Sequence, residues 1–379
     1  MSKATRGRAL RVGLAVLALG VVAVVSFAFL RADGPQGAGD AAAPLPEART
    51  GYMLDRADPA VGGLDSVIEF DLESGETSVV YSAERIDTFA ATERSLVIVS
   101  GTPDAHSLTS VDVASGTARE IALPAAGAVD SLASEGERAA FRFTSAGDPQ
   151  EREFSNALLW LEAGADTVKL VERDGAPFEA VAWSWLPGGA EMLAIDTEEE
   201  LLRFAPDAPN DVEGLGEWEG IEAVSADGGS AIVRDHHDTV VLSLDDGTAM
   251  PFGPTPVDGA APFGGDVVFL LDGPERVQKL ALPLDESGRV SSAIVVDDGE
   301  SPRVLYRASE REGIDGFEVA PDGRHVAIEV VPDVAGMVSD AYFPHARAVS
   351  IVTRIVSVAE GEVVAEFTGF GTQWGASAG

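Results

Sequence analysis

The chain has 379 residues, of which 45% are apolar and 23% are charged, a balance that supports a buried core and argues against global disorder. Its formal net charge is −37 at pH 7. A surface this acidic repels phosphate backbones and attracts basic partners or divalent ions, which argues against nucleic-acid binding by the folded part. The absence of cysteine excludes disulfides, thiol nucleophiles and lipid-modified cysteines.

The first predicted element is an N-terminal membrane anchor. Residues 1–11 form a basic segment, and residues 12–30 are 19 consecutive residues without a charge. As an α-helix the second segment is about 28 Å long, close to the thickness of the hydrocarbon core of a bilayer. Four basic residues precede it and one, Arg31, directly follows it. This distribution predicts a single-pass signal-anchor helix at the cell membrane, with a cytoplasmic N-terminus and an extracytoplasmic body.

A cleaved signal peptide is the alternative interpretation of the same segment. The small residues Ser26 and Ala28 match a cleavage site of the A-x-A kind, although the apolar stretch is longer than the usual core of a signal peptide. Cleavage near Ala28 makes the body a secreted protein. Residues 31–49 are rich in Ala, Gly and Pro without an apolar period, which predicts a flexible linker in either case.

Residues 50–379 are predicted to form one all-β domain, because short apolar runs alternate with Gly, Asp and Pro and no long amphipathic helix is evident. One element recurs as a strand, a tight turn closed by glycine, and a second strand. Its copies are FDLESG (70–75), VDVASG (111–116), LWLEAG (159–164), LSLDDG (242–247) and VSVAEG (356–361).

A second element is an apolar run, a polar turn with glycine and another apolar run. Its copies are FEVAPDGRHVAIEV (317–330), AVSADGGSAIV (223–233), AWSWLPGGAEMLAI (182–195) and SLASEGERAAFRF (131–143). The two elements together make a four-stranded unit that repeats about every 40 to 55 residues, which is typical of propeller blades. The innermost strands are expected near Phe89, Val129, Ala182, Val224, Ala261 and Phe317.

The two ends of the body supply complementary parts of one blade. Residues 51–54, 67–71 and 77–81 give three strands with no innermost strand before them, and GFGTQW (369–374) is left over at the C-terminus. Pairing of this last strand with the first blade closes the ring and removes its unpaired edges. The sequence therefore predicts seven blades, with six or eight as alternatives because the units near Asn210 and Asp285 are poorly marked.

Three turn segments, VAPDGRHVAI (319–328), VSADGGSAIV (224–233) and WSWLPGGAEMLAI (183–195), resemble the W-S-P-D-G-x-x-[IL]-A turn of TolB-like and WD-repeat-like propellers. The resemblance implies a propeller fold for most of the body. These motifs specify a blade turn and carry no chemistry, and the family is functionally diverse, so the resemblance implies no particular activity.

One histidine cluster suggests a metal site. Asp235, His236, His237 and Asp238 combine two imidazoles with flanking carboxylates, donors that suit zinc or a related ion. Adjacent side chains on a strand point to opposite faces, so a solvated hairpin turn is the plainer interpretation. Channel calcium is a further alternative, but LDDG (244–247) and VDDG (296–299) lack the ligand spacing of a calcium loop. No cofactor is predicted, since no phosphate loop, dinucleotide fingerprint or hydrolase motif is found.

Two candidate binding surfaces involve aromatic residues. The longest irregular stretch, residues 332–347, contains Met337, Tyr342, Phe343 and His345, and long propeller loops are often recognition sites. Trp183 and Trp185 alternate on one predicted strand and therefore face the same side. They either pack between blades or form a stacking platform.

Two functions follow from this architecture. The favoured one is a non-enzymatic binding or scaffolding module for a protein, a peptide or an envelope polymer. The alternative is a lactonase- or cyclase-like propeller enzyme with a divalent metal in the central channel. An enzyme requires several acidic or imidazole groups converging on the innermost strands, whereas the acids expected there, Asp130, Glu179, Glu222 and Glu318, are scattered.

Overall fold

In the part of the chain that the computed structural model describes, the regular elements are β-strands. The structure describes residues 49–58, 62–102, 104–148, 152–236, 238–253, 257, 267–269, 275–283, 290–298, 301–334 and 351–375. The chain divides into two compact units, Met1–Pro44 and Leu45–Gly379, and all described residues belong to the second. Within them, no helix has the length and apolar character needed to cross a membrane. The predicted anchor, residues 12–30, lies outside the described residues.

The first three sheets each contain four antiparallel strands. From the innermost strand outward, the first is β30 (Phe370–Trp374), β1 (Thr50–Asp55), β2 (Asp65–Asp71) and β3 (Thr77–Ala83). The second is β4 (Ile86–Ala91), β5 (Ser95–Thr102), β6 (Ala105–Asp112) and β7 (Ala118–Ile121). The third is β8 (Gly127–Glu135), β9 (Arg138–Ser145), β10 (Ala157–Glu162) and β11 (Lys169–Leu170), followed by the small hairpin β12 (Glu172–Arg173) and β13 (Ala176–Pro177).

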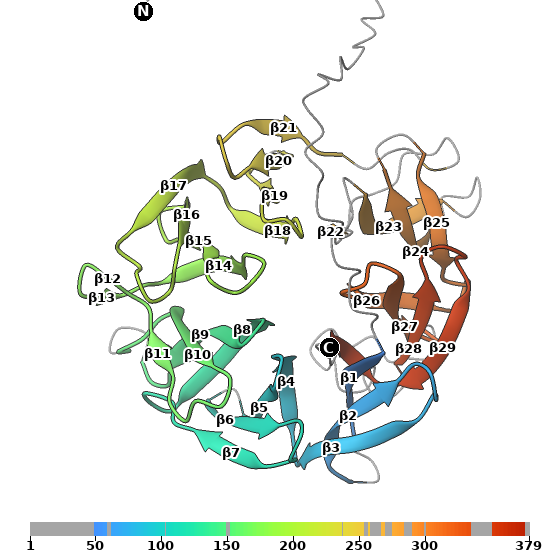
Figure 1. Cartoon of the computed structure of the whole chain (residues 1–379), viewed down its shortest axis with the longest axis horizontal. Coiled ribbons are helices and arrows are strands. Elements are labelled where there is room, and N and C mark those ends of the chain that lie inside the picture. The colour runs from blue at the N-terminus through green and yellow to red at the C-terminus, as the bar shows by residue number, and fades with distance from the viewer. Residues whose placement is uncertain are drawn as a thin grey trace, which may run out of the picture. The chain divides into compact units, whose positions relative to one another are not determined.

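Four more sheets complete the ring in Figure 1, which confirms the predicted seven blades. The fourth is β14 (Ala180–Trp185), β15 (Met192–Asp196), β16 (Glu200–Phe204) and β17 (Val212–Glu217). The fifth is β18 (Gly220–Val224), β19 (Ser230–Arg234), β20 (Thr239–Ser243) and β21 (Ala249–Pro251). The sixth is β22 (Val267–Phe269), β23 (Arg276–Pro283), β24 (Val290–Asp297) and β25 (Arg303–Arg307). The seventh is β26 (Gly313–Val319), β27 (His325–Val331), β28 (Val352–Ser357) and β29 (Val363–Thr368).

Strand β30 closes the ring as the innermost strand of the first sheet. It pairs antiparallel with β1, with Gly51 opposite Trp374. Trp374 contacts Phe70 of β2 edge to face, at 5.6 Å between ring centroids. The Phe70 ring also explains Gly51, because a Cβ atom there would lie 2.3 Å from the end of that ring. The sequence at both ends of the sheet is therefore fitted to a close approach of β1, β2 and β30.

The two recurring sequence elements correspond to two hairpins of each unit. The first element joins the third and fourth strands in five sheets, and its closing glycines adopt φ values from 67° to 77°, as the turn requires. In two of these turns, an aspartate accepts hydrogen bonds from the backbone and hydroxyl of a serine three residues later, Asp71 from Ser74 and Asp112 from Ser115. The second element joins the first and second strands.

Five of the six expected innermost strands lie where the repeat placed them, and the sixth sheet differs. Its innermost described strand is β22, Val267–Phe269, whereas the expected position near Ala261 lies outside the described residues. The repeat is weakest in this part of the chain, since neither hairpin motif has a clear copy there. The described part of this sheet therefore begins at β22, and the position expected near Ala261 stays a prediction.

The core lies between neighbouring sheets and is built mainly from their middle strands. One cluster joins Val97 and Leu108 of the second sheet to Phe141 and Leu159 of the third. Such layers recur around the ring, so each sheet depends on its neighbours for burial.

Antiparallel order fixes which connections share a face of the ring. Each sheet has two connections at one end. One is the turn from its second to its third strand, and the other is the crossover from its outermost strand to the next sheet. We call this end the crossover face. The turns between the first and second strands, and between the third and fourth, lie at the opposite end.

Candidate functional site

Acidic side chains gather on the crossover face around the fourth sheet. We define the acidic sector as four segments at this end of the third, fourth and fifth sheets, residues 171–180, 196–200, 217–220 and 234–238. Their described residues carry eleven carboxylates and two arginines, Arg173 and Arg234. The carboxylates belong to Glu172, Asp174, Glu179, Asp196, Glu198, Glu199, Glu200, Glu217, Glu219, Asp235 and Asp238.

A cleft of about 480 Å³ opens within the acidic sector between the β12–β13 hairpin and the β15–β16 turn. Its walls include Glu179, Glu198 and Glu200, with Pro177 and Phe178 as apolar neighbours. Arg173 also lines the cleft, with its Nη1 3.9 Å from Oδ2 of Asp196. The volume is that of a small-ligand site, but the lining is dominated by negative charge. Its chemistry suits a cationic group.

Three side chains converge beside this cleft, at the junction of the fourth and fifth sheets. Glu199, Glu219 and His236 each place one potential ligand atom within 4.8 Å of the others. Nδ1 of His236 is in close contact with Oε1 of Glu219. The three residues come from the β15–β16 turn, the β17–β18 connection and the β19–β20 turn. We call them the Glu–Glu–His cluster.

The predicted metal-binding set is therefore divided by the fold. His236 lies beside Glu199 and Glu219, while Asp235 and Asp238 build the turn that carries it. The Asp238 N–H donates to Oδ1 of Asp235 at 2.7 Å, and the Asp235 N–H donates to the Asp238 carbonyl at 3.0 Å. His237 lies outside the described residues. Sequence reasoning missed both glutamates, because they are 37 and 17 residues away from His236 in a chain full of acids.

A second group of titratable side chains lies on the inner strands of the seventh sheet. Glu318 of β26 is closely surrounded by protein although part of its side chain stays accessible, and no hydrogen bond or ion pair joins its carboxyl group to another described residue. Burial, with a smaller contribution from Glu329, raises the pKa of Glu318 to about 8. A neutral carboxylic acid at pH 7 is the consequence.

Glu329 of β27 is the neighbour of Glu318 and is itself 9% exposed. Burial raises its pKa, and hydrogen bonding from the backbone of Thr372 partly opposes that rise. The Thr372 N–H donates to Oε1 of Glu329 at 3.1 Å, which ties β27 to the closing strand β30. Oγ1 of Thr372 is buried and has no hydrogen-bond partner among the described residues. Sequence reasoning identified Glu318 as an innermost acid but did not find Glu329.

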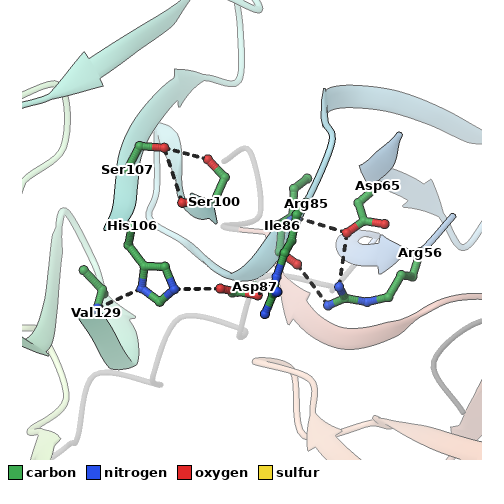
Figure 2. Close-up of polar contacts among 9 residues, drawn as sticks. All are labelled: Arg56, Asp65, Arg85, Ile86, Asp87, Ser100, His106, Ser107 and Val129. Carbon is green, nitrogen blue, oxygen red and sulfur yellow. Dashed lines mark hydrogen bonds and ion pairs between the residues drawn. The ribbon is translucent and has the colours of Figure 1, made fainter. Parts of the chain in front are cut away.

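Figure 2 shows a polar network on the crossover face of the first three sheets. Nδ1 of His106 accepts a 2.9 Å hydrogen bond from the Val129 N–H, so its proton is on Nε2, which lies 2.7 Å from Oδ2 of Asp87. That second contact is short but lies outside hydrogen-bond geometry. Because Nδ1 already accepts a hydrogen bond, this histidine is not placed to take a proton from a substrate. The network joins the second sheet to the third.

The remaining residues predicted from the sequence lie between sheets, in ion pairs or outside the described residues. Trp183 and Trp185 share one side of β14 and contact each other edge to face at 6.2 Å. Trp185 is 6% exposed, and both rings pack against the apolar layer between the third and fourth sheets. Of the scattered inner-strand acids, Asp130 pairs with Arg142 and Glu222 pairs with Arg234. The predicted loop residues Met337, Tyr342, Phe343 and His345 lie outside the described residues.

Comparisons with known proteins support the fold. No family model and no curated protein sequence matches the chain. Similar solved structures include an oligogalacturonate lyase in complex with manganese, with a TM-score of 0.53 and 9% identity over 82% of this chain and 91% of the lyase. The β-propeller domain of the Trilobed protease from Pyrococcus furiosus has a TM-score of 0.52 and 12% identity, over 84% and 92%. The chain is a seven-bladed β-propeller.

The propeller fold that the resemblance of the blade turns implies is confirmed. TolB from Acinetobacter baumannii has a TM-score of 0.41 and 18% identity over 70% of this propeller chain, which spans 65% of that protein. At identities this low, the likeness to the lyase and to the Pyrococcus domain carries the fold and no activity. The Pyrococcus domain has an open velcro topology, whereas β30 and β1 pair in this propeller.

Proposed function

We propose that this protein is an extracytoplasmic propeller, anchored by residues 12–30, that acts as a non-enzymatic binding module for a cationic segment of a protein or peptide. The acidic sector is the binding surface. The observation that carries the proposal is the cleft beside Glu179 and Glu198, where carboxylates from the third and fourth sheets face a shared opening.

Electrostatics supports a basic partner over other classes. The acidic sector belongs to a chain with a net charge of −37, so its local field adds to a negative background and attracts cations from a distance. Phosphate-rich ligands are repelled by the same field. Arg173 is engaged by Asp196 in the cleft, which leaves the glutamates there in excess. Lysine and arginine side chains suit such a surface, and association should be fast and sensitive to salt.

Binding of a labelled oligolysine peptide to the full-length chain in detergent tests the proposal. The double variant Glu179→Lys/Glu198→Lys reverses two exposed charges in the cleft and is expected to weaken binding at least about tenfold, because each reversal replaces an attraction with a repulsion. Glu73→Lys/Asp245→Lys is the matched control, since both residues are exposed at the opposite end of the ring. Equal losses in the two variants would show only a general effect of net charge and would reject the acidic sector as the site.

The anchor and its topology need a separate test. Residues 12–30 carry no charge and follow a basic segment, which supports a cytoplasmic N-terminus and an exported propeller. We expect the full chain to remain with the membrane after high-salt and alkaline washes, and the propeller to be accessible to protease only from the extracytoplasmic side. Release of a shortened chain that begins near residue 29 would instead support cleavage and secretion.

The alternative function is a propeller enzyme with a divalent metal in the channel. Glu318 and Glu329 favour it, because two neighbouring carboxyl groups with raised pKa values are typical of reactive sites. Among the described residues, however, the one group of three potential metal donors is the Glu–Glu–His cluster, which lies in turns and a connection of the crossover face and not within the innermost strands. Manganese-dependent turnover of a lactone or an oligogalacturonate that Glu318→Gln abolishes would establish the enzyme; its absence supports the binding module.

A further inference from the structure

We infer that the Glu–Glu–His cluster is a binding site for a zinc-like divalent cation at the junction of the fourth and fifth sheets. Glu199, Glu219 and His236 would each supply one ligand atom, and water would complete the coordination. This inference does not rest on the cationic-partner proposal, because the ligand here is the metal ion alone.

The positions of the donor atoms suit a single ion. Zinc lies about 2.0–2.2 Å from nitrogen and oxygen ligands, so donors on opposite sides of one ion are at most about 4.4 Å apart. The three donor atoms of the cluster already lie within 4.8 Å of one another. His236 is 65% exposed and Glu219 is 26% exposed, so small rotations of these side chains can bring the donors to bonding distance.

Backbone hydrogen bonds hold the three ligand-bearing segments together. The Trp218 N–H donates to the Glu199 carbonyl at 2.8 Å, and the Glu219 N–H donates to the Arg234 carbonyl at 2.8 Å. The first bond joins the β15–β16 turn to the β17–β18 connection, and the second joins that connection to the end of β19. The cluster is therefore assembled by the fold from segments that are distant in sequence, and the cost of gathering the ligands is met before an ion arrives.

The local turns present the outer two ligands. Oδ1 of Asp196 accepts hydrogen bonds from the backbone of Glu198 and Glu200, which fixes the turn with Glu199 at its apex. The hydrogen bonds between Asp235 and Asp238 fix the turn that carries His236. Each of these two ligands thus lies in a tight, hydrogen-bonded turn, where its side chain projects beyond the strands.

Arg234 orients the third ligand. Its Nη1 lies 3.6 Å from Oε2 of Glu219, and its Nε donates to Glu222 at 2.9 Å. Oε2 of Glu219 therefore faces the arginine while Oε1 faces His236. Ligating carboxylates are usually held by outer-shell partners, and Arg234 is placed to be that partner for Glu219.

The donor types select the class of ion. Imidazole favours zinc and its neighbours in the transition series, whereas calcium and magnesium prefer sites made only of oxygen ligands. Two glutamates and one histidine supply three ligands of types that zinc accepts, and they leave the fourth position of a tetrahedral ion open to water. An ion bound here would connect the fourth sheet to the fifth.

Titration of the untagged full-length chain with zinc chloride, followed by calorimetry, tests the inference. We expect one saturable zinc site, and a higher melting temperature with zinc than without it. Glu199→Gln, Glu219→Gln and His236→Ala are each expected to weaken zinc binding about 100-fold or more, because each removes one of three protein ligands. Glu199 and His236 are exposed and Glu219 is partly exposed, so folding defects should be small, which the melting temperature of the metal-free variants checks.

Two matched controls separate the cluster from its surroundings. Glu213→Gln removes an exposed charge from β17 outside the cluster, and His237→Ala removes the adjacent histidine. Both are expected to keep parental zinc affinity. Absence of a saturable zinc site would overturn the inference, and so would loss of zinc binding in the His237 variant or equal binding of calcium and zinc. A failure here leaves the oligolysine result untouched, since no peptide is present.

Discussion

Arg56 and Asp65 show how single residues hold neighbouring sheets together at the crossover face. Nη1 of Arg56 lies 3.1 Å from Oδ2 of Asp65, and their side chains are 9% and 5% exposed. Asp65 also accepts a hydrogen bond from the N–H group of Ile86 at 3.0 Å (Figure 2). A further hydrogen bond, from the N–H group of Ala57, is also 3.0 Å long. Ile86 begins the second sheet, so this one carboxylate joins two sheets. A buried charge is tolerated here because both carboxylate oxygens accept hydrogen bonds.

Removing that carboxylate leaves a buried arginine without its main partner. We expect Asp65→Ala to lower the free energy of unfolding by about 3–5 kcal/mol, the usual cost of breaking a buried ion pair. Glu162→Ala is the control, because its pair with Lys169 is half exposed and should contribute at most about 1 kcal/mol. Urea unfolding followed by tryptophan fluorescence measures both. Equal losses would mean that burial does not distinguish these pairs.

Glu318 makes the stability of the propeller depend on pH. Its pKa is about 8 in the folded protein, against 4.5 for an unperturbed glutamate. Between these values the unfolded chain loses the proton while the folded chain keeps it. The free energy of unfolding therefore falls as pH rises from about 4.5 to about 8 and stays low above that range. Glu329 contributes in the same direction, since its pKa is also raised.

Glu318→Gln should reduce this dependence, because glutamine does not ionise. We expect the variant to match the parent near pH 5 and to exceed it by about 1–3 kcal/mol at pH 8, because there the folded parent holds a proton that its unfolded chain has lost. Urea unfolding at the two pH values measures the difference. Glu73→Gln, at a side chain that is 80% exposed, should follow the parent at both. A Gln variant that is less stable than the parent at pH 8 would mean that the ionised carboxylate is stabilising.

At the scale of the strand, the closing element β30 carries its stability through Trp374. The ring is 8% exposed and packs in the cluster with Phe70 and Phe367, while its Nε1 has no hydrogen-bond partner among the described residues. Its contribution is therefore apolar. The residue matters mainly for its volume and its aromatic face.

Two substitutions separate these contributions. Trp374→Ala should lower the free energy of unfolding by about 3–5 kcal/mol, because it opens a cavity between the first and seventh sheets. Trp374→Phe keeps an aromatic ring against Phe70 and gives up no hydrogen bond, so it should cost less than half as much. Thermal unfolding by circular dichroism compares them. If phenylalanine is as damaging as alanine, the indole nitrogen has a role that its surroundings do not indicate.

Local elements were predictable from the sequence because their causes are local. The turn at Gly116 needs a residue that accepts a positive φ, and an aspartate, Asp112, that accepts a hydrogen bond from the Ser115 N–H. These residues lie within five positions of one another. The Glu–Glu–His cluster depends on three segments that only the ring brings together, so His236 could be identified and its partners Glu199 and Glu219 could not. The pair of Arg56 and Asp65 was missed for the same reason, since nothing in the sequence marks those two charges as buried.

At the scale of the whole molecule, charge opposes the compact ring. The chain has a net charge of −37, and folding brings its negative charges closer together. Their mutual repulsion lowers the free energy of unfolding at low ionic strength. Salt screens it, since the Debye length falls from about 30 Å at 0.01 M to about 10 Å at 0.1 M.

Raising sodium chloride from about 10 mM to about 500 mM should therefore raise the melting temperature by at least about 3 °C. Sucrose at equal osmolality is the control for exclusion effects, because it does not screen charge. Differential scanning calorimetry makes the comparison. A melting temperature that stays constant or falls with salt would mean that the acidic groups are already neutralised by local partners.

The pairing of β30 with β1 has a consequence for biosynthesis. The first sheet receives its innermost strand only when residue 374 is available, although β1 begins at residue 50. During synthesis from the N-terminus, the edge of β1 therefore waits unpaired while the other six sheets form, and such an edge is prone to association with other chains. Its contacts have high sequence separation, which slows folding. A prematurely ended chain would therefore leave an open arc in which the first sheet lacks its innermost strand.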